Sequence, residues 1–255
     1  MKTTDIKIDF VSGSSHELRL EIGACKLIVT PDDGNDWVVG TYTDPTDNLP
    51  MIISDNNSVV TISQERNFSG FVGLLSGTPT FNLKLGKGKP YSFTINGGAS
   101  ECDIDLGGLP ITSVSIAHGA AKTDLNFSAK NPVDMTKLTV SGGATATAMT
   151  NLSNASVSEI RIEGGASSYK LDFGGSFTKD AKVSISTGMS SVDATIPKGL
   201  SVKLQPEATM GSVNIPDGFT KKEGVFLNES ALSGKTPLLW IQSSVTMGSI
   251  NVRYS

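Results

Sequence analysis

A short glycine motif recurs along this chain and limits its fold more than any other feature. It reads NGGA, HGA, SGGA, EGGA and TGM, and its five reference glycines are separated by 21, 24, 22 and 23 residues. The same register continues less regularly at both ends, which gives the reference positions Gly23, Gly98, Gly119, Gly143, Gly165, Gly188, Thr209 and Thr246. A period of this length indicates stacked repeats that bury their apolar faces jointly. We therefore interpret the chain as eight copies of a unit of about 22 residues.

Apolar residues stand at fixed distances from each reference position. Five residues before it, every copy has an apolar side chain, from Leu18 in the first copy to Ile241 in the last. Three residues before it, the column is again apolar, except for Pro206 and Ser243 in the last two copies. Positions two residues apart share one face of a strand, and the alternation resumes after the glycine. Each copy is therefore predicted to be a strand, a glycine bend and a second strand.

These observations predict an all-β fold, namely a right-handed β-helix-like solenoid whose adjacent layers lie about 4.8 Å apart. A β-sandwich is the alternative, because short strands with frequent turns suit that fold too. No linker divides the chain, so we expect a single domain over residues 1–255. Within it, residues 1–92 are expected to form an N-terminal cap and degenerate layers. Residues 93–255 are expected to form regular layers, with an insertion at 219–237.

Charge and hydropathy remove several classes of partner. The net charge is -4 and the lysines and arginines are scattered, so we expect no nucleic-acid binding. The longest apolar runs, such as 238–241, are too short to span a bilayer. Residues 1–10 alternate polar and apolar side chains, unlike a signal peptide. We expect a soluble chain without a signal peptide or transmembrane segment, from which an upstream anchor could have been removed.

The repeat also carries a resemblance to a known family. The apolar-x-apolar-x-Gly-Gly-Ala bends, the segment GMSSVDATIPKGLSVKLQPEATMGSVNIP and the ending VTMGSINVRYS resemble the bacterial "putative adhesin" domains of the toastrack superfamily. That group includes the C-terminal domains of LiaF-type cell-wall-antibiotic-response proteins. The resemblance covers the chain from about Leu18 to the end and is strongest after Phe93. It implies a non-enzymatic protein of the bacterial cell envelope or surface that acts as a binding, adhesin-like, scaffold or sensing module.

No motif of nucleophilic or metal-dependent catalysis occurs in the sequence. Neither G-x-S-x-G nor H-E-x-x-H is present, and the resemblance implies no catalytic residues. His118 stands directly before a reference glycine and is interpreted as a side chain packed at the bend. His16, which precedes the first repeat strand, is expected at the surface. Cys25 and Cys102 fall in different repeat columns and several copies apart, so we expect buried thiols, although one disulfide remains arithmetically open.

One group of oxygen-bearing side chains is a candidate cation site. Asp103 and Asp105 lie on the outward face of one copy, and Asp124 and Asn126 hold the equivalent places in the next. A hard cation such as Ca²⁺ suits such a patch, whereas Lys122 beside Asp124 favours an ordinary solvated surface. No other cofactor is expected. The alternative function is a carbohydrate-active β-helix enzyme that uses these aspartates for acid-base chemistry.

Exposed apolar residues are the remaining candidates for contact with a partner. Leu238 and Trp240 alternate with Leu239 and Ile241, and the repeat assigns Ile241 to the core. Leu238 and Trp240 are therefore expected to face outward. The apolar stretch at 71–77 is a second candidate. We expect the partner to be a protein or a cell-surface glycan, and a homo-oligomer remains an open alternative.

Overall fold

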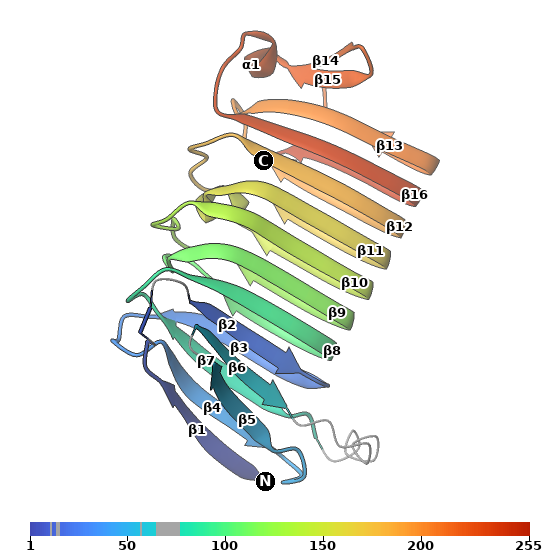
Figure 1. Ribbon diagram of the computed structural model, residues 1–255. Helices are drawn as coiled ribbons and strands as arrows, with labels where there is room; N and C mark the ends of the chain where they lie inside the picture. Colours follow the sequence, from blue (N-terminus) through green and yellow to red (C-terminus); the bar gives the residue numbers. More distant parts are fainter. Residues whose placement is uncertain (11, 14–15, 57, 65–76) are drawn as a thin grey trace.

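One continuous sheet, folded along its length, makes up most of the protein. A computed structural model describes residues 1–10, 12–13, 16–56, 58–64 and 77–255, so most of the apolar stretch at 71–77 lies outside the described residues. Five long strands form the regular part, and each pairs in parallel with the next (Figure 1). They are β8 (Tyr91–Asp105), β9 (Ile111–Asn126), β10 (Met135–Thr150), β11 (Val157–Asp172) and β12 (Ala181–Ile196).

The reference glycines lie in register where these strands bend. A Cβ atom added at Gly165 would stand 2.6 Å from the carbonyl oxygen of Gly143, and one added at Gly143 would stand 2.9 Å from the carbonyl oxygen of Gly119. These distances are too short for a real Cβ atom. Close approach of successive backbones therefore explains the glycines here, and the bend folds each strand into two arms.

The core lies between the two arms, as the apolar columns predicted. The column five residues before the glycine is buried in all eight copies, including Leu138 and Ile160. On the second arm, Tyr169 and Leu171 are buried in the same way. Apolar residues of the connecting loops, such as Leu106 and Phe173, close the remaining side. The all-β solenoid is confirmed, and its layers bury a single continuous core.

The N-terminal layers are shorter and end in antiparallel strands. β2 (Glu17–Ile22) and β3 (Cys25–Asp32) together form one bent layer on β8. The next layer consists of β6 (Val59–Gln64) on β2 and β7 (Thr80–Gly86) on β3. Three antiparallel strands then pair at this end of the sheet: β1 (Lys2–Ile8), β4 (Val38–Asp44) and β5 (Met51–Asn56).

This arrangement corrects two expectations from the sequence. Cys25 and Cys102 are not several copies apart, because β3 and β8 are neighbours and Cys25 pairs with Ser100. The chain between them forms layers on the opposite side of β2 and β3, which the period could not indicate. Both thiols are free and buried. His16 is also buried rather than at the surface, since its ring packs edge-on against Trp37 at 5.8 Å.

The C-terminal strands are not stacked in sequence order. β16 (Leu238–Tyr254) lies between β12 and β13 (Ser201–Asn214), in parallel with both, which Figure 1 shows as a red strand below an orange one. β13 is therefore the last long strand. The insertion forms β14 (Phe219–Lys222), β15 (Val225–Asn228) and the short helix α1 (Glu229–Leu232). Within β13, only Lys203 and Leu204 pair with β15, so the second arm of β13 is left uncovered by it. Val213, which the apolar alternation after the bend predicts to be inward, is therefore 37% exposed.

Candidate functional site

The outward face of the last layers combines an aromatic ring with cations, amides and hydroxyl groups. Along β16, Leu239 and Ile241 point into the core, while Leu238 and Trp240 lie on the other face and are half-buried. The backbone N–H of Leu238 donates to Asp180 Oδ1 at 2.7 Å, which fixes the start of the strand. Trp240 pairs in register with Lys182 of β12 and with Lys203 of β13.

The two lysines hold the Trp240 ring between them. Lys182 Nζ lies 4.8 Å from the centre of the ring, and Lys203 Nζ lies 4.4 Å from it. Because these lysines come from the strands on either side, the ring stands between two ammonium groups. Such contacts are attractive because the ring face carries partial negative charge. Trp240 Nε1 is buried and has no hydrogen-bond partner within the described part of the chain.

A hollow of about 310 Å³ continues along the same face, beyond Trp240 toward the bend. Gln242, two residues after Trp240, donates through Nε2 to Gln205 Oε1 at 2.9 Å. On β11, Arg161 forms an ion pair of 2.7 Å with Glu159. Other lining side chains are Ser184, Ser186, Ser244, Glu163 and Glu207. The hollow therefore presents many hydrogen-bond donors and acceptors on a sheet.

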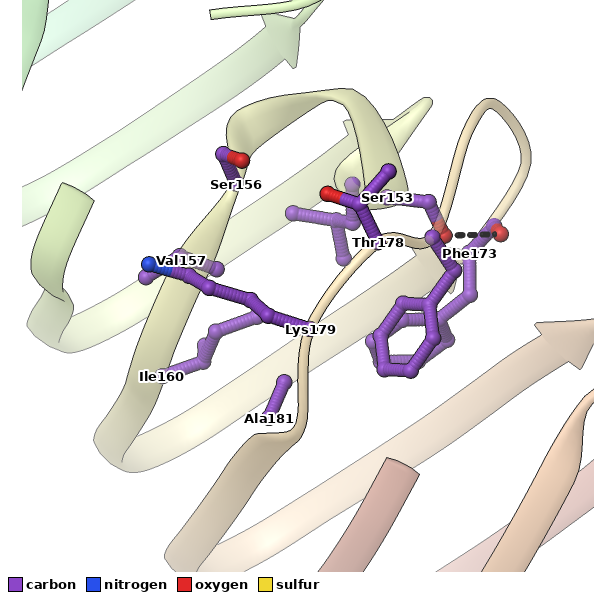
Figure 2. A pocket seen from close by; sticks show the side chains of 10 residues that line it. Ser153, Ser156, Val157, Ile160, Phe173, Thr178, Lys179 and Ala181 are labelled. Atoms are coloured by element: carbon purple, nitrogen blue, oxygen red, sulfur yellow. Dashed lines mark hydrogen bonds between the residues drawn. The ribbon is translucent and has the colours of Figure 1, made fainter. Parts of the chain in front are cut away.

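Two other cavities are less suited to a ligand. Figure 2 shows a cavity beneath the loop that precedes β12, where Ser153 Oγ donates to the Phe173 carbonyl oxygen at 2.6 Å. Its volume of about 10 Å³ is enough for about one water molecule. A hollow of about 620 Å³ lies on the outward face near Gly40, but apolar side chains such as Ile28, Val39 and Leu83 take up part of its lining, so it offers fewer hydrogen-bonding groups than the hollow beyond Trp240.

The aspartate patch has the predicted register. Asp103 pairs with Asp124, and Asp105 pairs with Asn126. Asp105 Oδ1 accepts hydrogen bonds from the backbone N–H groups of Gly107, at 2.9 Å, and Ser128, at 3.1 Å.

The other two members also have protein partners. Lys122 Nζ lies 3.3 Å from Asp124 Oδ2, and this hydrogen bond raises the pKa of Lys122. Asn126 Oδ1 accepts from Thr150 Oγ1 and Asn151 Nδ2. Among the described residues, no group of three or more His, Cys, Asp and Glu side chains has an arrangement that could hold a metal ion.

His118 is packed at the bend, as interpreted from the sequence. Its Nδ1 is 3.1 Å from Ser100 Oγ, and its Nε2 is 3.9 Å from Cys102 Sγ. Burial lowers the pKa of His118 to about 4 and raises that of the Cys25 thiol to about 12. Burial also raises the pKa of Cys102. At neutral pH this cluster is uncharged, so it supplies no thiolate and no imidazolium.

Comparison with known proteins places the chain in a family. The family described as "N-terminal domain of toast_rack, DUF2154" matches residues 1–144. The chain belongs to the toast_rack family. The match includes the irregular N-terminal layers, whereas the resemblance seen in the sequence is strongest after Phe93. No curated protein matches the chain.

A solved structure shares the fold of this chain. A "putative cell adhesion protein" from Clostridium sporogenes is 18% identical, with a TM-score of 0.56, over 100% of this chain and 99% of that chain. At this identity the likeness concerns the fold alone. A "putative adhesin" from Bacteroides fragilis is 8% identical over 99% and 96% of the two chains, with a TM-score of 0.46. In the described part of this toast_rack protein, no helix is long and apolar enough to cross a membrane.

Sequence reasoning identified Trp240 but missed the residues around it. Lys182 and Lys203 occupy the same repeat column as Trp240, six residues before their reference positions, and this signal was available. It was not decisive because the sequence order of the copies placed β13 directly after β12. Only the insertion of β16 between them brings both lysines to the ring.

Proposed function

We propose that this chain is a non-enzymatic binding module of the bacterial cell surface, and that its ligand is a glycan with acidic groups. The observation that carries the proposal is the Trp240 ring between Lys182 and Lys203, at the end of a hollow lined by amide and hydroxyl groups. Family membership and the name of the Clostridium sporogenes structure support a surface binding role.

The chemistry of the face fits a charged sugar. Two ammonium groups attract carboxylate or phosphate groups, and the amides and hydroxyls of Gln205, Gln242 and Ser184 can exchange hydrogen bonds with sugar hydroxyls. A lysine is flexible, so an acidic group that draws one ammonium away exposes a ring face for stacking. The layers present this face without hinges, so little order is lost on binding.

Binding to acidic polysaccharides tests the proposal. The protein is applied to an array of bacterial polysaccharides that carry uronic acids or phosphodiesters, with neutral dextran alongside, and hits are measured by calorimetry. We expect Trp240→Ala to weaken binding at least ten-fold, which corresponds to about 1.4 kcal/mol, typical of an aromatic residue at the centre of an interface. Lys182→Ala and Lys203→Ala should each weaken it several-fold.

A matched control lies in the same column of the repeat. Lys137 of β10 is an outward lysine two strands from Lys182, and no aromatic ring packs on it within the described residues. Lys137→Ala should leave affinity unchanged. Retention of affinity in Trp240→Ala, or equal loss in Lys137→Ala, would refute the site. Binding to no acidic polysaccharide would refute the glycan and favour a protein partner.

The absence of catalysis is part of the same proposal. Burial lowers the pKa of His118 and raises the pKa of the Cys25 and Cys102 thiols, so these side chains are uncharged at neutral pH, which supports the proposal. The protein partners of Asp105 and Asp124 support it as well. Incubation of the bound polysaccharide with a large excess of protein should release no shorter product. Release of product by the wild type, with loss of release in Asp124→Ala, would establish the carbohydrate-active alternative.

A further inference from the structure

Three methionines form an exposed row at the bend of the last three long strands. Met189 of β12 pairs in register with Met247 of β16, and Met247 pairs with Met210 of β13. Their exposed fractions are 56%, 38% and 60% in that order. The central Met247 is the least exposed, as expected for a side chain flanked by two long neighbours. Three of the seven methionines of the chain are thus gathered on one surface.

Packing does not explain this row. The same column carries a small exposed residue in the layers that precede it, namely Ala99, Ala120, Ala144 and Ala166. Those layers bend in the same way with alanine, so the fold does not require a long side chain here. Methionine is confined to three adjacent strands, and β16, which carries Met247, lies between β12 and β13.

The backbone after the methionines brings the strands close together. A Cβ atom at Gly211 would collide with the carbonyl oxygen of Gly248, and one at Gly248 would collide with that of Ser190. Glycine at these two positions therefore keeps the three strands in contact directly beside the row. The Cα atoms of paired strands are about 4.8 Å apart, a distance that the flexible side chains of neighbouring methionines can bridge through one ion.

We infer that this row is a binding site for a soft monovalent cation, Cu(I), held by the three thioether sulfur atoms. Thioethers are soft ligands that select Cu(I), whereas Ca²⁺ and Mg²⁺ prefer oxygen ligands. The site needs no deprotonation, because a thioether carries no proton, so its affinity should not depend on pH. It is separate from the Trp240 face, because Met247 lies at the bend of β16, seven residues after Trp240.

Ag(I) is the probe, because it resembles Cu(I) and is stable in air. The protein, labelled with ¹³C at the methionine methyl groups, is titrated with silver nitrate in chloride-free buffer and followed by NMR. We expect the methyl signals of Met189, Met210 and Met247 to shift together and to saturate at one equivalent. Silver captured by the buried thiols would be a separate phase that leaves these signals unmoved.

Methionine-to-leucine variants assign the signals and test the geometry. Met247→Leu leaves two thioethers at twice the strand spacing, so it should weaken Ag(I) binding at least ten-fold. Met189→Leu and Met210→Leu each leave an adjacent pair and should weaken it less. The methyl signal of Met1, which is 90% exposed, is the matched control and needs no substitution.

Two outcomes would overturn the inference. One is a shift of the three signals no larger than that of Met1, and the other is an affinity within two-fold of wild type in Met247→Leu. A thermal unfolding curve for each variant verifies that it is folded. Glycan binding by Met247→Leu should equal that of wild type, so failure of this site and failure of the Trp240 site are distinguished.

Discussion

The stack of reference glycines predicts opposite effects for one substitution made at two equivalent positions. A Cβ atom at Gly165 would stand 2.6 Å from the Gly143 carbonyl oxygen, whereas one at Gly119 would stand 3.4 Å from the Gly98 carbonyl oxygen, an ordinary contact. Neither glycine has a positive φ, so alanine is compatible with the backbone angles of both. The difference between the two sites is therefore the space available to one methyl group.

The magnitudes follow from two opposing contributions. Alanine in place of glycine stabilises by about 0.4–1 kcal/mol when the native conformation accepts it, because the unfolded chain loses freedom. Forcing an additional carbon into a well-packed region costs about 1–3 kcal/mol. We expect Gly119→Ala to show only the first effect. Gly165→Ala should show both, with a net loss of about 1–2 kcal/mol because its backbone neighbours lie in paired strands and can move little.

Thermal unfolding followed by circular dichroism measures the contrast. For a chain of this size, 1 kcal/mol corresponds to a change in Tm of about 2–4 °C. Gly165→Ala should lower Tm by about 2–8 °C, and Gly119→Ala should raise it by about 1–4 °C. A shift of the same sign and size in both variants would refute the explanation, because the glycines would then serve backbone flexibility rather than close approach.

Two further predictions concern titration and cations. Because burial lowers the pKa of His118 to about 4, the unfolded chain binds more protons than the folded chain between about pH 6.5 and 4. The stability that the neutral His118 contributes is complete above that range and falls by on the order of 3 kcal/mol as pH decreases through it. The Tm should therefore fall further in wild type than in His118→Asn. Parallel curves of Tm against pH for the two proteins would contradict this. Millimolar Ca²⁺ should leave Tm unchanged, because the oxygens of Asp105 and Asn126 accept hydrogen bonds from the protein. A rise in wild type that is absent from Asp103→Ala/Asp124→Ala would instead establish the cation patch.

The repeat predicted which residues are equivalent but not which layers are neighbours. Leu204 of β13 and Ile241 of β16 occupy the same inward column, so the apolar pattern cannot order the two strands. One residue, Pro206, does indicate the order of the two strands. Pro206 has no backbone N–H to donate, and proline in a sheet is confined to edge strands or bulges. It marks β13 as the last long strand, and the pairing with β15 ends two residues before it, at Leu204.

Part of the candidate site could be predicted from the alternation of apolar and polar residues. The alternation around Ile241 correctly placed Trp240 on the outward face, since a period of two fixes the face of every residue in a strand. The contacts with Lys182 and Lys203 depend on strand order and so required the structure. The N-terminal strands were harder still, because an antiparallel pair such as β1 and β4 has no periodic counterpart elsewhere in the chain.

The position of β16 has a consequence for synthesis of the protein on the ribosome. The strand of 17 residues that joins β13 and its hairpin to the other layers is made after all the other described strands. Until it emerges, β13 could pair directly with β12, because Val183 and Leu204 hold the same column and both pair with Ile241 in the folded protein. The last strand must then separate them or reach β12 first. A truncation before Leu238 would therefore remove an interior layer rather than a terminal one, and with it Trp240 and both of its lysine contacts.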